Sequence, residues 1–253
     1  MHALEGALPD FHAIIPAGGV GSRLWPLSRA EAPKFLHDLT GSGHTLLGDT
    51  WNRVLPLAGS AGIMVVTGRA HRAAVQAQLP DLLDENIVLE SEPKDSSAAI
   101  GLAAAILHRR HPDVIVGSFA ADHVITDSER FRHTVAEAVA VARAGYITTI
   151  GISPSEPSVG FGYIARGAAL SVEGAPHAHL VDCFVEKPDL PTATTYVESG
   201  DYLWNAGMFI ARADTLLAQL AETEPMLHEG LREIAAAWDT DARADVVDAV
   251  WPL

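Results

Sequence analysis

The residues whose types and spacing could do chemistry gather in one glycine-rich loop, residues 17–27, near the N-terminus. Its three glycines are Gly18, Gly19 and Gly21. Glycines in a turn between a strand and a helix let backbone N–H groups surround an anion, because no side chain blocks the approach. Arg23 and Lys34 add positive charge beside the loop, and the apolar run 13–15 before it predicts a buried strand. The pattern predicts a site for a polyphosphate.

Two better-known phosphate loops do not fit this sequence. A Walker A loop needs a Lys followed by Ser or Thr directly after its last glycine, whereas Gly21 is followed by Ser22 and Arg23. The dinucleotide fingerprint needs a third small residue where its helix packs on the strand, and its register places Leu24 or Trp25 there. Glycines alone would indicate no more than a tight turn, but the added positive charge favours a functional loop.

The full pattern reads Gly-Gly-x-Gly-x-Arg-Leu-x-Pro-Leu and is followed by Pro-Lys at residues 33–34. It resembles the signature of the sugar-1-phosphate nucleotidyltransferases. Trp25, residues 28–29 and residues 34–36 make the chain most similar to the mannose-1-phosphate guanylyltransferase (GDP-mannose pyrophosphorylase) branch of that family. The resemblance runs from about Phe11 to the last residue, through several motifs in the expected order.

This resemblance implies an activity. Enzymes of the branch transfer GMP from GTP to mannose-1-phosphate, which gives GDP-mannose and pyrophosphate, and they use Mg²⁺. Two alternatives stay open: UTP, ATP or dTTP used with another sugar-1-phosphate, and a non-catalytic regulatory subunit that binds a nucleotide sugar. We expect GTP and mannose-1-phosphate as partners, and we leave a homodimer open.

The resemblance also implies roles for the N-terminal motifs. Backbone groups of the loop would bind the nucleotide at Ala17, Gly18, Gly19, Gly21 and Ser22. Arg23 would neutralise the leaving pyrophosphate, and Lys34 would reach the same phosphates. Asp122 follows the apolar run 114–119 and fits the Mg²⁺ ligand of the family, in the Asp-His form of this branch. Mg²⁺ prefers carboxylates, phosphate oxygens and waters, although a lone Asp would otherwise indicate a helix cap or a loop acid.

Three further motifs are implied to bind the sugar-1-phosphate. In Glu-Lys-Pro, Glu186 would bind sugar hydroxyls and Lys187 would bind the phosphate as a point charge. Taken alone, these residues would indicate a surface turn closed by Pro188. Gly162 would let the backbone approach the sugar, and Asn205 would hydrogen-bond its hydroxyls. The segments around these two residues are also compatible with a hairpin or a core strand that binds no ligand.

Another motif, residues 92–98, would lie beside the base and the ribose. Glu92 and Ser96 are the candidate nucleotide-binding residues, and Asp95 or Ser96 is the predicted N-cap of a helix. The commoner guanylyltransferase pattern has Asn-Thr-Ala-Pro at residues 95–98, and this chain departs from it. The guanine preference is therefore inferred mainly from the resemblance to the branch.

Strand-like apolar runs alternate with helix-like segments along the chain. Strands are predicted at 13–15, 62–67, 87–90, 114–119, 146–152, 180–185 and 208–211, and helices at 46–55, 70–78, 97–108, 129–144, 191–199 and 213–220. This alternation predicts an α/β fold, a mainly parallel sheet with helices on both faces, as in the Rossmann-like nucleotidyltransferase fold. Residues 154–167 read as a loop and hairpin. The ligand should lie at the carboxyl ends of the strands, near the glycine loop.

Composition narrows the function classes. The net charge of −15, with only 17 Lys and Arg, argues against a nucleic-acid surface. No apolar run approaches the length of a membrane helix, and the single Cys183 excludes an internal disulfide, so we expect a cytoplasmic protein. The 12 histidines are scattered without metal-ligand spacing.

One departure concerns the C-terminus. The resemblance implies a second Mg²⁺-binding Asp in a Trp-x-Asp-x-Gly type motif, and the chain reaches residues 251–253 before such a motif. We therefore expect an N-terminal tail at 1–10 and a nucleotidyltransferase domain at 11–253 that is incomplete at its C-terminus. The acidic segment 222–248 is predicted to be helical. Its aspartates are predicted to face solvent; they are Asp239, Asp241, Asp245 and Asp248.

Overall fold

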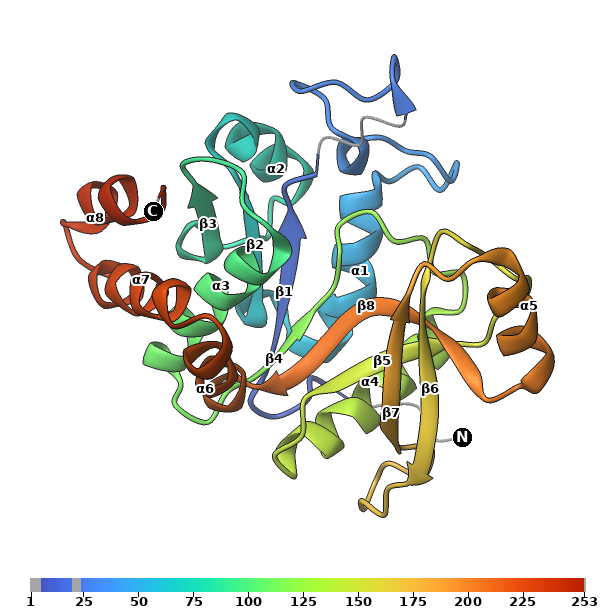
Figure 1. Cartoon of the computed structure of the whole chain (residues 1–253). Coiled ribbons are helices and arrows are strands. Elements are labelled where there is room, and N and C mark those ends of the chain that lie inside the picture. The colour runs from blue at the N-terminus through green and yellow to red at the C-terminus, as the bar shows by residue number, and fades with distance from the viewer. Residues whose placement is uncertain (1–5, 20–23, 253) are drawn as a thin grey trace.

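The computed structural model describes residues 6–19 and 24–252, and in them the strands form one mixed sheet (Figure 1). The strands are β1 (Phe11–Ala17), β2 (Ile63–Gly68), β3 (Ile87–Glu90), β4 (Ile115–Ser118), β5 (Thr148–Ile152), β6 (Gly162–Ala169), β7 (His179–Glu186) and β8 (Tyr202–Arg212). Their order is β3-β2-β1-β4-β8-β6-β7, and β5 pairs with β8. The pairs among β3, β2, β1 and β4 are parallel, and all pairs beyond β4 are antiparallel.

The predicted α/β fold is confirmed, with a parallel core in the N-terminal half. The C-terminal half differs from the predicted parallel arrangement for a simple reason. β6 and β7 are joined by the short connection 170–178, which allows only an antiparallel hairpin, whereas parallel neighbours need a long crossover. The hairpin predicted at 154–167 therefore begins later, at Gly162, and its second strand is β7.

Helices cover both faces of the sheet (Figure 1). Their bounds are α1 (Leu46–Ala58), α2 (Arg72–Gln78), α3 (Ser96–Arg110), α4 (Ser128–Arg143), α5 (Leu190–Ser199), α6 (Ala213–Thr223), α7 (Pro225–Ala237) and α8 (Arg243–Val250). Alternation along β1 links the two layers: Ala13 and Ile15 join the core under α1, α2 and α4, whereas Ile14 joins the core under α3, α6 and α7. Both faces of β1 are therefore covered by helices, and only His12 and Pro16 of this strand are partly exposed.

The acidic segment after α6 is helical, as predicted, but two of its aspartates have partners in the rest of the fold. Asp239 accepts a hydrogen bond from Arg110 Nη2 at 2.7 Å, and Asp248 forms an ion pair with Arg69. Both carboxylates nevertheless face solvent, as predicted, with 60% of the Asp239 side chain and 54% of the Asp248 side chain exposed. Their partners lie more than 120 residues away in the sequence, so no local pattern indicates the pairing.

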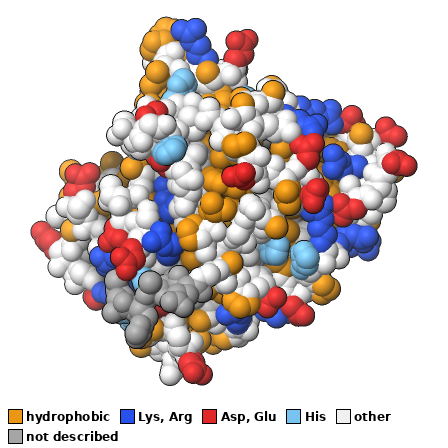
Figure 2. All heavy atoms as spheres, turned by 180° about the vertical axis from the view of Figure 1, so that it is seen from behind, with side chains coloured by type: hydrophobic (Ala, Val, Ile, Leu, Met, Phe, Trp, Pro, Cys, Tyr) orange, Lys and Arg blue, Asp and Glu red, His pale blue; other side chains and the backbone are white. Residues whose placement is uncertain are grey.

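On the face seen from behind in Figure 2, charged side chains of both signs are mixed. Figure 2 shows acidic and basic groups interspersed over the back face, with apolar side chains near its middle. Within the described ranges, every helix falls short of the length and apolar character that a membrane crossing requires.

Candidate active site

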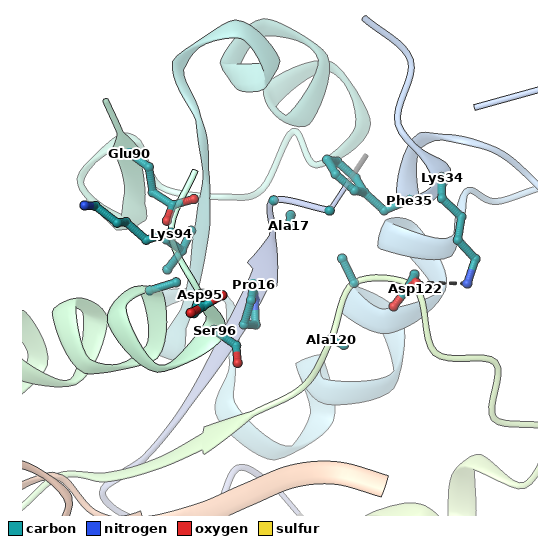
Figure 3. A pocket seen from close by; sticks show the side chains of 15 residues that line it. Pro16, Ala17, Lys34, Phe35, Glu90, Lys94, Asp95, Ser96, Ala120 and Asp122 are labelled. Carbon is teal, nitrogen blue, oxygen red and sulfur yellow. Dashed lines mark hydrogen bonds and ion pairs between the residues drawn. The ribbon is translucent and has the colours of Figure 1, made fainter. Parts of the chain in front are cut away.

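A cavity of about 350 Å³ opens at the carboxyl ends of β1, β3 and β4 (Figure 3). Parallel strands end at the same edge of a sheet, so the segments that follow them meet there. The residues that line the cavity come from six segments: 16–19, 34–35, Val66 of β2, Glu90 of β3, 94–99 in part, and 120–122. The cavity is thus built from the predicted glycine loop, the Lys34 motif, the start of α3 and the Asp122 motif.

Four of the eight predicted nucleotide-binding residues line this cavity. Ala17, Gly18 and Gly19 form its floor, and Ser96 lines it from the first turn of α3. Gly21, Ser22 and Arg23 lie outside the described residues, so their predicted roles stay predictions. Asp95 occupies the predicted N-cap position of α3, but its side chain accepts no capping hydrogen bond there and lines the cavity instead.

Lys34 and Asp122 face each other at one end of the cavity (Figure 3). Lys34 Nζ donates to Asp122 Oδ2 at 2.9 Å, and the two side chains are 32% and 41% exposed. Such a partly exposed pair adds no more than about 1 kcal/mol to stability. Its importance is chemical, because it places a cation for phosphate oxygens beside a carboxylate for a metal ion.

Helix α1 holds the segment that carries Asp122. Thr50 Oγ1 donates to the carbonyl of Ala120 at 3.4 Å, and Arg53 Nη2 donates to the carbonyl of His123 at 3.0 Å. Both donors are buried. Burial also lowers the pKa of His123, which keeps its ring neutral and supports a structural role for it. The carboxylate of Asp122 is therefore presented by a segment that is anchored on both sides.

Asp122 is a single carboxylate, and this limits which metal ion it could help to hold. The described part of the chain contains no group of three or more His, Cys, Asp or Glu side chains placed to hold a metal. This excludes a zinc-type cage among those residues, since zinc takes three or four protein ligands. It fits Mg²⁺, which takes one or two carboxylates and completes its shell with substrate phosphates and waters.

At the opposite end of the cavity lies an acidic side chain that sequence reasoning missed, Glu90 (Figure 3). Glu90 ends β3, is 5% exposed, and its Oε1 has no hydrogen-bond partner among the described residues. Burial raises the pKa of Glu90 to about 7, against a smaller lowering by the backbone N–H of Lys94. One feature of the sequence points to Glu90: it is a charged residue at the end of an apolar run, at a position where a core residue would be apolar.

Gly18 lies directly against this acid. A Cβ on Gly18 would stand 3.3 Å from Glu90 Oε2, so the carboxyl group would have to shift by a few tenths of an ångström. Glu92, the acid that the sequence favoured, does not line the cavity: its side chain pairs with Lys94 at 3.1 Å. The structure therefore places Glu90, rather than Glu92, in the cavity wall.

The four predicted sugar-binding residues lie together on β6, β7 and β8. Gly162 pairs with Glu186, and a Cβ on Gly162 would stand 2.7 Å from Glu186 Oε2 and 3.6 Å from the Cβ of Asn205. Lys187 Nζ lies 2.7 Å from Glu186 Oε1, and both side chains are exposed. Asn205 Oδ1 accepts hydrogen bonds from Thr149 and from the backbone N–H of Gly207, which leaves its amide nitrogen available as a donor.

The register of β8 relates this cluster to Asp122. Ser118, the last residue of β4, pairs with Phe209 of β8. Asn205 precedes Phe209 by four residues and, because the two strands are antiparallel, lies beyond the end of β4. The cluster therefore lies past the carboxyl end of β4, on the side from which Asp122 projects. It does not line the 350 Å³ cavity itself.

Comparisons with known proteins agree with this geometry. The family model described as "Nucleotidyl transferase" matches residues 12–252. The chain is 40% identical to the mannose-1-phosphate guanylyltransferase of Escherichia coli (strain K12), over 96% of this chain and 51% of that protein. It is 39% identical to the xanthan biosynthesis protein XanB of Xanthomonas campestris pv. campestris (strain B100), over 93% of this chain and 49% of that protein. The chain thus spans about half the length of the curated relatives it matches.

Solved structures show the same relationship. A crystal structure from Thermus thermophilus, described as a mannose-1-phosphate geranyltransferase, superposes with a TM-score of 0.83 at 27% identity, covering 95% of this chain and 68% of that one. A putative glucose-1-phosphate thymidylyltransferase from Bacillus anthracis shares the fold, with a TM-score of 0.55 at 16% identity over 95% of each chain. Since the family model covers nearly the whole sequence, the chain belongs to the nucleotidyl transferase family.

Proposed function

We propose that this chain is the guanylyl-transferring unit of a mannose-1-phosphate guanylyltransferase, which joins GTP to mannose-1-phosphate and releases pyrophosphate. The observation that carries the proposal is the cavity, in which glycine backbone lies between a buried acid at one end and the pair Lys34–Asp122 at the other. The name of the Escherichia coli relative supports the same reaction.

The buried acid supports guanine as the base. A carboxylate presents two acceptors, and guanine offers two adjacent donors, N1–H and the N2 amino group. Uracil and thymine offer one donor flanked by two carbonyls, and adenine and cytosine place an acceptor beside their amino group. Glu90 therefore favours guanine over the other bases.

The distance across the sheet suits an extended nucleotide. Glu90 follows β3 and Asp122 follows β4, and three strand spacings separate these strands, which is about 14 Å. The base would lie against Glu90 and Gly18, the ribose over the start of α3, and the phosphates at Gly19 and Lys34.

The remaining residues take roles at the reacting groups. Asp122 would hold Mg²⁺, which neutralises charge on the triphosphate when bound. Lys34 would move from Asp122 to phosphate oxygens, and Arg23 would bind the leaving pyrophosphate. Glu186 and Asn205 would hold the sugar hydroxyls, with Lys187 on the phosphate of mannose-1-phosphate.

In the reaction, an oxygen of the sugar phosphate forms a bond to the α-phosphorus of GTP, and the bond from that phosphorus to the pyrophosphate oxygen breaks. No side chain needs to form a covalent bond. Catalysis then depends on positioning and on neutralising charge, as in other phosphoryl transfers.

The test is pyrophosphate release by the purified 253-residue chain with GTP, mannose-1-phosphate and Mg²⁺. We expect release with GTP that exceeds release with UTP, ATP or dTTP, and that stops when Mg²⁺ is chelated. The variant Arg23→Ala should lose turnover and keep its circular dichroism spectrum. Equal use of UTP would count against guanine, and tight GTP binding without release would indicate a binding subunit instead.

A further inference from the structure

The C-terminal end of the described chain is bonded to the loop that forms the base end of the cavity. This loop, residues 91–95, connects β3 to α3 and contributes Lys94 and Asp95 to the cavity wall. Trp251 Nε1 donates to the carbonyl of Glu92 at 2.8 Å, and Lys94 Nζ donates to the carbonyl of Pro252 at 3.2 Å. The loop thus accepts one hydrogen bond from residues 251–252 and donates another to them.

The indole of Trp251 is fixed by the core and not by the loop. Trp251 is 4% exposed and belongs to the apolar cluster formed with α3, α6 and α7. Asp248, one turn earlier, pairs with Arg69 in the segment that follows β2. Helix α8 is therefore attached to both loops that follow β2 and β3, next to the cavity.

Apart from the two bonds to residues 251–252, the bonds of the loop are local: Lys94 contacts Glu90 and Glu92, and the carbonyl of Asp95 accepts from the first turn of α3. Pro93 has no backbone N–H to donate. Among the hydrogen bonds of the described residues, the indole of Trp251 is the donor to the carbonyl of Glu92. Without that donor the carbonyl would turn to water, and residues 91–95 would sample other conformations. Glu90 directly precedes this loop, and the N–H of Lys94 acts on its carboxyl group.

We infer that Trp251 is a positioning residue for nucleotide binding: its indole N–H fixes the loop 91–95, and the fixed loop sets the wall against which the base binds. The inference rests on the proposed function for the identity of the ligand, a guanine nucleotide. It assigns to Trp251 no contact with the nucleotide and no part in the chemical step.

The chain supplies a matched control for the test. Trp238 lies in the same apolar cluster and is 3% exposed, but its Nε1 has no hydrogen-bond partner among the described residues. Trp251→Phe and Trp238→Phe therefore make the same change in volume and each remove one indole N–H. They differ in whether a hydrogen bond to the loop is lost.

Two measurements decide the inference: amide hydrogen exchange of residues 91–98, and the dissociation constant for GTP by calorimetry. Relative to Trp238→Phe, Trp251→Phe should exchange faster in this segment and bind GTP about tenfold more weakly, the size expected for one buried hydrogen bond. The KM for mannose-1-phosphate should not differ between the two variants.

Equal exchange in the two variants would overturn the inference, as would faster exchange with equal GTP affinity. A global loss of protection in Trp251→Phe would show a merely structural role and would overturn it too. Failure of the proposed function has a different signature, since the wild-type chain would then prefer another nucleotide. The ratio of affinities between the two variants, measured with that nucleotide, would still decide the role of Trp251.

Discussion

Burial and the proposed base binding favour opposite protonation states of the Glu90 carboxyl group. In the free protein its carboxyl group is buried with one oxygen unpaired among the described residues, so burial raises its pKa to about 7 and favours the neutral form. Two donors of a guanine base would instead favour the ionised form. A site that is unfavourable when empty and satisfied when filled is expected of a binding residue rather than of a core residue.

A pH dependence of stability follows from this carboxyl group. The native state holds its proton up to about pH 7, whereas the unfolded state loses it near pH 4.5, so the native state binds more protons between these values. The free energy of unfolding should therefore fall as pH rises from 4.5 to 7, by up to about 3 kcal/mol. Glu90→Gln should remove this fall and be the more stable protein at about pH 8. Urea unfolding at about pH 5 and about pH 8 measures it, with the exposed Glu198→Gln as control.

At the scale of elements, α3 is the helix on which the site depends, and it is enclosed on all sides. Its buried residues run from Ala98 to Leu107 with one partly buried position, because the sheet covers one side and α6 and α7 cover the other. A Cβ on Gly101 would stand 2.6 Å from Leu231 Cδ1 and 3.1 Å from Leu220 Cδ1. Gly101 therefore sets how closely α6 and α7 pack on α3.

Replacing this glycine should destabilise the fold even though alanine is the better helix former. Gly101→Ala gains about 1 kcal/mol in helix propensity but overpacks the contact with Leu231, so we expect a net loss of about 1–2 kcal/mol. In Gly48→Ala of α1, the Cβ would meet its neighbours at 3.5 Å, an ordinary contact. That variant should be neutral or stabilised. A higher midpoint for Gly101→Ala in urea would contradict the packing argument.

The sequence predicted the parallel half of the fold well because its strands are buried on both faces and read as apolar runs. It could not predict that β8 runs antiparallel to β4, because a run of apolar residues looks the same for a parallel and for an antiparallel strand. The site residues divide in the same way, into those that belong to a local sequence motif and those that do not. The glycine loop, Lys34 and Asp122 were predicted as site residues because each belongs to a local motif. Gly18, Gly19, Lys34 and Asp122 line one cavity because parallel strands end at one edge of the sheet.

Glu90 and Trp251 were not found, for different reasons. Glu90 ends an apolar run and carries no motif, so only its burial beside Gly18 indicates a role. The contact between Trp251 and Glu92 joins residues 159 positions apart, which local spacing does not indicate. The same distance explains why the partners of Asp239 and Asp248 were missed.

At the scale of the whole molecule, a chain with a net charge of −15 is proposed to bind a polyanion. The long-range field opposes this binding, so local groups must outweigh it: backbone N–H groups at the glycine loop, Lys34 and the Mg²⁺ proposed to bind at Asp122. The opposing field falls off within about 8 Å at physiological ionic strength, whereas the contacts in the cavity are shorter than that.

Nucleotide binding should therefore be visible as stabilisation of the whole chain. At about 100 times its dissociation constant, GTP with Mg²⁺ should raise the free energy of unfolding by about 2.7 kcal/mol. For a protein of this size that corresponds to a rise of about 5–10 °C in the melting temperature. UTP at the same concentration should give a smaller shift, and so should GTP with a chelator. Equal shifts with both nucleotides would remove the role of Glu90 in base selection.

The hydrogen bond from Trp251 to Glu92 also orders events during synthesis. Glu92 leaves the ribosome 159 residues before its partner, which at about 5–20 residues per second is a delay of about 8–30 s. The parallel strands β1 to β4 and the glycine loop are complete long before then and can already pack. The loop 91–95 gains this hydrogen bond only after α8 has been synthesised, so the proposed nucleotide affinity of a nascent chain should rise about tenfold at that stage.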